Sequence, residues 1–104
     1  MNQRLNNAIG LCKKAGKCVS GGLAVEVAIK QGKTCLVILQ QDASDNTKKQ
    51  YQDLCAYYNV PLMMAQTVGH AIGQPNRMVM AVKDENFKKM IESACEHNSQ
   101  EIRG

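Results

Sequence analysis

The side chains in this sequence best suited to redox or metal chemistry are its five cysteines, at positions 12, 18, 35, 55 and 95. Their number is odd and no two have CxxC spacing, whereas a disulfide framework or a tetrahedral zinc site needs closer, paired cysteines. Cys12 and Cys55 fall on the apolar stripes of expected helices, where a thiol packs as a small hydrophobe. His70 and His97 have no cysteine or carboxylate at metal-ligand spacing. We therefore predict reduced, mostly buried thiols, with no metal, no cofactor and no catalytic residue.

The segment from Gly10 to Lys17 looks at first like a P-loop, the glycine-rich turn that holds nucleotide phosphates. Five residues rather than four separate its glycines, and Cys18 stands where Ser or Thr must hold magnesium. The segment also ends an expected helix, whereas a P-loop follows a strand. These departures exclude a P-loop nucleotide site. A thiol enzyme with a Cys–His pair stays open as a third reading, although nothing selects one cysteine over another.

The stretch Ser20-Gly21-Gly22-Leu23 opens an expected helix and carries no carboxylate in its first turn. A helix N-terminus attracts anions through its unpaired N–H groups and its dipole, and most helices guard that end with acidic residues. Glycines also let another backbone approach closely, and Lys17 stands just before them. The sequence thus indicates a phosphate site at Gly21 and Gly22. The plainer alternative is an ordinary Ser20 cap followed by flexible glycines.

A second glycine-rich segment without acidic residues spans residues 69–77 and ends in Arg77. A segment that only connects two elements would be a solvated turn, and such turns are more common than binding loops. Positive charge is concentrated in the first part of the chain, where residues 1–41 carry six basic residues and one acid, a net charge of +5. A partner with phosphates requires such an excess. If the fold brings residues 69–77 beside Ser20 and the two glycines, they form one basic edge.

The elements that must position these residues are predicted from the hydrophobic pattern as helices and strands in strict alternation. Helices are expected over 4–15, over 20–31, from a Ser44 cap to Asn59, from Thr67 over a short stretch, and from an Asp84 cap; strands are expected over 18–19, 35–39, 60–65 and 78–82. Such alternation implies an α/β fold with a sheet sandwiched between helical layers. We expect one domain over residues 1–97 and a frayed C-terminal tail over 98–104. No apolar run approaches the roughly 20 residues that span a bilayer, and no signal-peptide stretch follows the polar N-terminus, so we expect a cytoplasmic protein without membrane contact.

Taken in order, these pieces resemble the kink-turn RNA-binding ribosomal-protein superfamily, the group of the large-subunit proteins seven-Ae and thirty-e, and within it the bacterial YlxQ-type proteins. The resemblance covers roughly residues 4–92. It rests on Leu11-Cys12-Lys13-Lys14-Ala15-Gly16-Lys17, Val19-Ser20-Gly21, Ala28-Ile29-Lys30-Gln31-Gly32-Lys33, Leu36-Val37-Ile38-Leu39, Asp42-Ala43-Ser44, Tyr57-Tyr58-Asn59-Val60-Pro61 and Ala71-Ile72-Gly73, in this order.

The resemblance implies a three-layer α-β-α sandwich with a small mixed sheet. In the family, the RNA-binding edge combines the start of the second helix with the late glycine-containing loop. It also implies a non-catalytic protein that recognises structured RNA, with ribosomal RNA or a kink-turn-like element as candidates and a protein partner within a ribonucleoprotein as an open alternative. The expected contacts are Lys13, Lys14 and Lys17 to phosphates, Ser20, Gly21, Gly22 and Leu23 at the start of the second helix, and Ile72, Gly73 and Arg77 closing over bases or backbone.

The family's kink-turn binders open this helix with Gly-x-Asn-Glu and place Lys three residues after the Glu. The matching positions here are Gly21, Gly22, Leu23, Ala24 and Val27, of which only the first glycine is kept. Because the Asn-Glu pair reads sheared G·A pairs, we expect binding through phosphates and RNA shape rather than base readout. The alternative function on the same fold is a protein-interaction module, in which the Leu23–Val27 face meets a protein.

Overall fold

The computed structural model describes the backbone of residues 3–103 and the side chains of residues 3–95. Its elements, in chain order, are α1 (Gln3–Lys14), β1 (Cys18–Ser20), α2 (Gly22–Lys30), β2 (Leu36–Gln40), α3 (Asp45–Tyr57), β3 (Leu62–Ala65), β4 (Val79–Val82) and α4 (Glu85–Arg103). None of the helices in the described part of the chain is long and apolar enough to cross a membrane.

The strands form one mixed sheet in the order β1-β4-β2-β3. Strands β2 and β3 run parallel, while β4 is antiparallel to both of its neighbours. All four residues of β4, and the first four of β2, are buried. A continuous apolar run is what a strand covered on both faces requires, so the two central strands lie where the sequence pattern predicts.

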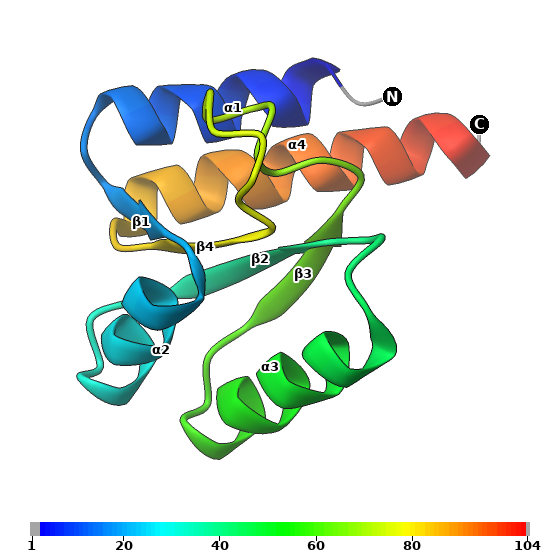
Figure 1. Cartoon of the computed structure of the whole chain (residues 1–104). Coiled ribbons are helices and arrows are strands. Elements are labelled where there is room, and N and C mark those ends of the chain that lie inside the picture. The colour runs from blue at the N-terminus through cyan, green and yellow to red at the C-terminus, as the bar shows by residue number, and fades with distance from the viewer. Residues whose placement is uncertain (1–2, 104) are drawn as a thin grey trace.

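Helices cover both faces of this sheet, with α1 and α4 on one side and α2 and α3 on the other (Figure 1). The side chains of β2 alternate between the layers: Leu36 and Ile38 join the core against α1 and α4, and Val37 and Leu39 join the core against α2 and α3. This is the period of two that a strand imposes on its side chains. The predicted three-layer α-β-α sandwich with a small mixed sheet is confirmed.

The ends of the first three helices share one arrangement. Gly16, with a φ of 70°, follows α1, and the Lys17 N–H donates to the Cys12 carbonyl at 3.1 Å. Gly32 and Asn59, with φ of 69° and 58°, close α2 and α3 in the same way. This is the Schellman motif, in which a left-handed residue lets the chain fold back over the last turn. The turn after α1 therefore sets the direction in which the chain enters β1.

The segment between β3 and β4 is not the short helix predicted from Thr67. It is a series of turns, in which the Gln74 N–H donates to the Gly69 carbonyl at 2.8 Å. A Cβ at Gly69 would lie within 3 Å of three carbonyl oxygens of this loop, so the loop is too tightly folded there for any other residue. Gly73, with a φ of 73°, and Pro75 further limit a helix. The apolar period that predicted a helix reflects loop residues that pack on the core.

Helix α4 begins as predicted, since Asp84 Oδ1 accepts from the N–H groups of Asn86 and Phe87 at 2.8 and 3.2 Å. Ile91 of this helix is buried, whereas Met90 beside it is 44% exposed. The expected tail over residues 98–104 also differs, because the helical backbone continues to Arg103. No Gly or Pro interrupts it before that point.

Candidate nucleic-acid interface

The fold brings together the two segments that the sequence singled out. Ser20, the last residue of β1, donates its hydroxyl proton to Gln74 Oε1 at 2.9 Å, across 54 positions of sequence. Next to it, the Gly21 N–H donates to the Val79 carbonyl at 3.0 Å. The start of α2 and the loop before β4 therefore form one continuous edge. The bond to Gln74 also corrects the expectation that Ser20 caps α2, because Gly21 is the cap residue and offers no side chain.

Arg77 reaches back over Gly21 from the late loop. A Cβ at Gly21 would overlap Arg77 Nη1, so the guanidinium lies against the face that glycine leaves open. Gly21 also has a φ of 92°, which L side chains rarely adopt. Both features explain why glycine is needed here, and they place a permanent cation at the cap of α2.

That end of α2 is already electropositive. Its first turn carries no acidic residue. The Val25 N–H is the first to bond within the helix, to the Gly21 carbonyl at 3.0 Å, so the N–H groups of Gly22, Leu23 and Ala24 have no helical acceptor. A cation beside a helix N-terminus is unfavourable by about 0.3–1 kcal/mol, the reverse of the usual charge–dipole stabilisation. An anion bound between the guanidinium and these N–H groups reverses that sign.

Gly21 and Gly22, both predicted to offer their N–H groups to a phosphate, differ in whether that N–H is already hydrogen-bonded. The Gly21 N–H is spent on Val79, so it cannot bind a phosphate as we expected. Gly22 is exposed, and its N–H has no acceptor within the helix. A Cβ on Gly22 would lie 3.2 Å from the Tyr51 hydroxyl, which donates to the Gly22 carbonyl at 3.4 Å. The N–H groups without a helical acceptor at this end therefore begin at Gly22.

Leu23 and Val27 lie on the outer face of α2, where they are 79% and 43% exposed. Neither side chain can accept or donate a hydrogen bond. The edge thus presents backbone N–H groups and a guanidinium next to the exposed apolar side chains of Leu23 and Val27.

The expected RNA contact of Ile72 is wrong. Its side chain is 6% exposed and packs in the core against α1 and α4, so it does not close over RNA. Gly73 beside it is exposed and turns the chain with a positive φ. The sequence pattern could not separate a loop residue that faces outward from one that anchors the loop.

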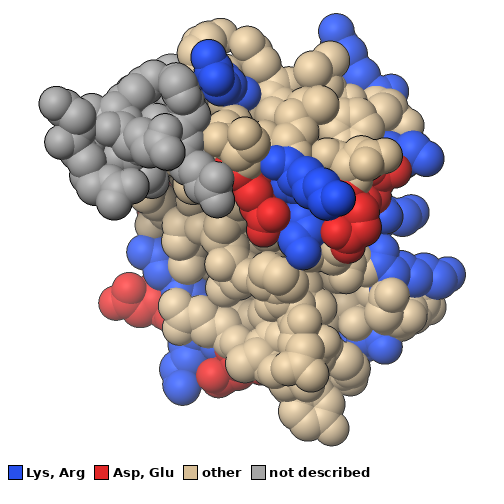
Figure 2. Space-filling view, turned by 180° about the vertical axis from the view of Figure 1, so that it is seen from behind, with Lys and Arg blue, Asp and Glu red and all other residues tan. Residues whose placement is uncertain are grey.

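The three predicted lysines are all exposed. Lys14 borders a shallow hollow of about 390 Å³ that also involves Ala71 of the late loop. The positive charge of Lys13, together with that of Lys83, lowers the pKa of Cys18 in β1. On the back of the molecule, acidic and basic side chains mix in the centre, whereas basic ones line the edge at the right of Figure 2. That edge corresponds to the side of Figure 1 where α1 ends and β1 begins.

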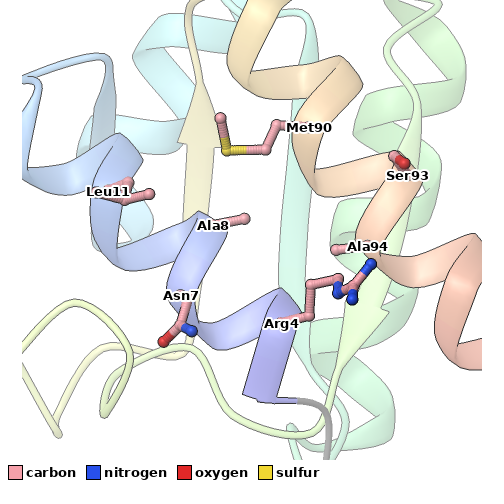
Figure 3. A pocket seen from close by; sticks show the side chains of 7 residues that line it. All are labelled: Arg4, Asn7, Ala8, Leu11, Met90, Ser93 and Ala94. Atoms are coloured by element: carbon pink, nitrogen blue, oxygen red, sulfur yellow. The ribbon is translucent and has the colours of Figure 1, made fainter.

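A second hollow, of about 300 Å³, lies between α1 and α4 (Figure 3). Met90 of α4 faces Ala8 and Leu11 of α1 across it, which accounts for the half-exposed Met90 and Leu11. It lies in the layer opposite α2, so it does not join the basic edge. Among the described residues, no group of three or more His, Cys, Asp or Glu side chains could hold a metal ion.

Comparisons with known proteins agree with this architecture. The model of the ribosomal protein L7Ae/L30e/S12e/Gadd45 family matches residues 3–92. A Bacillus subtilis (strain 168) protein named RNA-binding protein YlxQ is 39% identical over 86 residues, 80% of this chain and 86% of its own length. An Enterococcus faecium protein of the same name is 35% identical over 97 residues, 90% of this chain and 93% of its own.

Two solved structures show the same fold. A Bacillus halodurans protein of unknown function is 32% identical and superposes with a TM-score of 0.82, over 92% of this chain and 99% of that one. A Giardia lamblia 15.5kD RNA binding protein superposes with a TM-score of 0.71 at 18% identity, over 88% of this chain and 81% of that one. At that identity the likeness concerns the fold alone.

Proposed function

The chain belongs to the ribosomal protein L7Ae/L30e/S12e/Gadd45 family, and on that premise we propose that it binds structured RNA and catalyses no reaction. Two relatives that align over most of their length carry the name RNA-binding protein. The observation that carries the proposal is the Arg77 guanidinium over Gly21, at a helix start without acidic residues. We place this activity in the cytoplasm, with ribosomal RNA as the leading partner.

A phosphate fits this edge because two kinds of donor converge on it. Arg77 supplies a planar cation that pairs with two phosphate oxygens, and the N–H groups that begin at Gly22 supply a dipole of the same sign. Lys14 borders the late loop from α1 and extends the positive field along the RNA backbone. Ser20 positions the loop through Gln74 rather than contacting the ligand.

Recognition by this edge depends on shape. Phosphate contacts fix orientation without reading sequence, and Leu23 and Val27 offer only apolar surface. A folded RNA that presents closely spaced phosphates to the edge, and an open base or sugar face to Leu23, satisfies it best.

The experiment is a binding titration of the full chain with a structured fragment of ribosomal RNA at low salt. We expect Arg77→Gln to weaken binding about tenfold or more, the usual value of a charged hydrogen bond. Lys49→Gln is the matched control, because it removes the same charge away from the proposed site. Lys49 lies on α3 in an exposed ion pair with Asp53, with 3.5 Å between Lys49 Nζ and Asp53 Oδ2. Equal losses in both variants would show that only net charge matters, and the site would be wrongly placed.

The second candidate is a protein-interaction module, favoured by the 79% exposure of Leu23. Crosslinking in cells followed by sequencing of the recovered RNA distinguishes the two. Recovery of defined RNA fragments, lost in Arg77→Gln, supports the RNA proposal. Absence of any bound RNA, in cells and at low salt in vitro, favours a protein partner.

A further inference from the structure

Three thiols gather at the corner where α1 ends and the sheet begins. Cys12 is fully buried, and Cys18 and Cys35 pack partly buried against the same core cluster. Cys18 pairs with Val82 of β4 from one side, while the Cys35 N–H donates to the Val82 carbonyl from the other. The sequence spacing gave no reason to group these cysteines, because the sheet order brings them together.

Within this corner, Cys12 and Cys18 are the close pair. The Schellman turn folds Lys17 back on Cys12, and the Cys12 thiol donates to the Lys17 carbonyl at 3.5 Å. The Lys17 carbonyl belongs to the peptide group that joins Lys17 to Cys18. The Cys12 sulfur therefore lies beside the stretch of backbone from which the Cys18 side chain begins.

We propose that Cys18 is a thiol–disulfide exchange site that takes a low-molecular-weight disulfide, and that Cys12 resolves the adduct as an intramolecular Cys12–Cys18 disulfide. The two residues have the unequal access that such a sequence of steps requires. Cys18 is partly exposed and meets the small disulfide, whereas Cys12 has no exposed surface and reacts only with its neighbour.

The electrostatics of the corner favour Cys18 as the attacking group. The interaction with the Cys12 thiol, together with the charges of Lys13 and Lys83, lowers the pKa of Cys18 to about 7 against the opposing effect of burial. The thiolate is the nucleophile in exchange, and exchange is fastest when the pKa lies near the ambient pH. By contrast, burial raises the pKa of Cys35, with Glu85 adding to the effect and Lys88 opposing it.

The reaction balances as two exchanges. The Cys18 thiolate attacks one sulfur of the small disulfide, whose S–S bond breaks to release one thiolate that takes up a proton. Cys12 then loses its proton to water and attacks the Cys18 sulfur, which releases the second small thiol. Two protein thiols are oxidised by two electrons, and one small disulfide is reduced to two thiols.

The second exchange becomes easier once the first has occurred. The interaction with Cys18 is the largest cause that raises the pKa of Cys12, followed by burial, the charge of Cys18 and the carboxylate of Asp84. In the mixed disulfide Cys18 carries no charge and accepts no thiol proton, so that cause is removed.

The test treats the full, folded chain with oxidised glutathione near neutral pH, blocks the remaining thiols, and maps tryptic peptides by mass spectrometry. Cleavage after Lys13, Lys14 and Lys17 puts Cys12 and Cys18 on separate peptides, so the linked pair is identified directly. We expect the Cys12–Cys18 link as the main product. With Cys12→Ala, the product is expected to stop at glutathione attached to Cys18, and Cys35→Ala is expected to change nothing.

A second measurement needs only the wild-type protein. The rate at which a thiol reagent labels Cys18 is followed against pH, and we expect its midpoint near 7, below those of Cys35 and Cys55, whose pKa values burial raises. A Cys12–Cys35 link, adducts spread evenly over several cysteines, or a Cys18 that labels no faster than Cys35 would each overturn the proposal.

Discussion

Arg77 and Gly21 lie against each other although 56 positions of sequence separate them, and the guanidinium fills the space that a Cβ on Gly21 would take. The contact joins the loop before β4 to the cap of α2. One glycine therefore serves two requirements, a φ of 92° and room for a cation. The same contact makes the edge sensitive to single-atom changes at either residue.

Gly21→Ala is expected to lower the free energy of unfolding by about 1–3 kcal/mol, because it strains the backbone and displaces Arg77. Gly16→Ala is the matched control, since Gly16 has a φ of 70° but nothing within 4 Å of its added Cβ. In urea unfolding, adding Arg77→Ala is expected to recover part of the loss for Gly21→Ala and none for Gly16→Ala. Equal recovery in both would mean that the guanidinium does not lie over Gly21.

RNA affinity is expected to fall with salt. If about three phosphates are neutralised, the log–log slope of affinity against salt is roughly −2 to −3. The net charge of +5 in residues 1–41 motivates this expectation. Titrations from low to moderate salt measure the slope, and Arg77→Gln is expected to reduce its magnitude by about one. A slope near zero would contradict phosphate-dominated binding.

Ile72→Ala is expected to lower the free energy of unfolding by about 2–5 kcal/mol, because the side chain is buried in the core against α1 and α4. The folded fraction is expected to keep its affinity for RNA. Chemical denaturation and binding at a temperature where the variant is folded check the two parts. A selective loss of binding without loss of stability would return Ile72 to the interface.

We expect the protein to bind a kink-turn and the same RNA with its G·A pairs made Watson–Crick equally well, so that the ratio of the two affinities is near one. Leu23, Ala24 and Val27 stand at the positions that would carry hydrogen-bonding or charged side chains, and all three are exposed. The triple variant Leu23→Asn, Ala24→Glu and Val27→Lys is expected to raise the ratio, on the scale of about 1–3 kcal/mol per bidentate base contact. Because these positions are exposed, the change leaves the core intact. A wild-type preference of about a hundredfold or more, worth about 2.7 kcal/mol, would show that other groups read the kink.

Replacing all five cysteines by alanine is expected to cost stability, mainly at Cys12 and Cys55, which are 0% and 2% exposed. The folded fraction is expected to bind RNA as the wild type does. Circular dichroism and a binding titration measure the two effects. Stoichiometric zinc in protein purified without added metal, or lost binding by a well-folded variant, would contradict this expectation.

Local sequence signals predicted the elements whose causes are local. Ser44 caps α3 by accepting from the Thr47 N–H at 3.2 Å, and Asp84 caps α4 in the same manner. The apolar run that begins at Cys35 becomes the buried strand β2. Caps and periodicity act within a few residues of chain, so they can be read without knowing what packs against them.

Long-range contacts decided the rest. The burial of Ile72 against α1 and the diversion of Ser20 from a helix cap to Gln74 depend on partners more than fifty residues away. The chemistry of Cys18 likewise depends on a turn and a sheet register that place Cys12 and Lys83 beside it. By itself the sequence determined the layers of this fold and which two segments carry its positive edge. Only the tertiary structure decided which atoms of those segments remain open to a ligand, because burial and hydrogen bonding across the sheet consume some donors and leave others exposed.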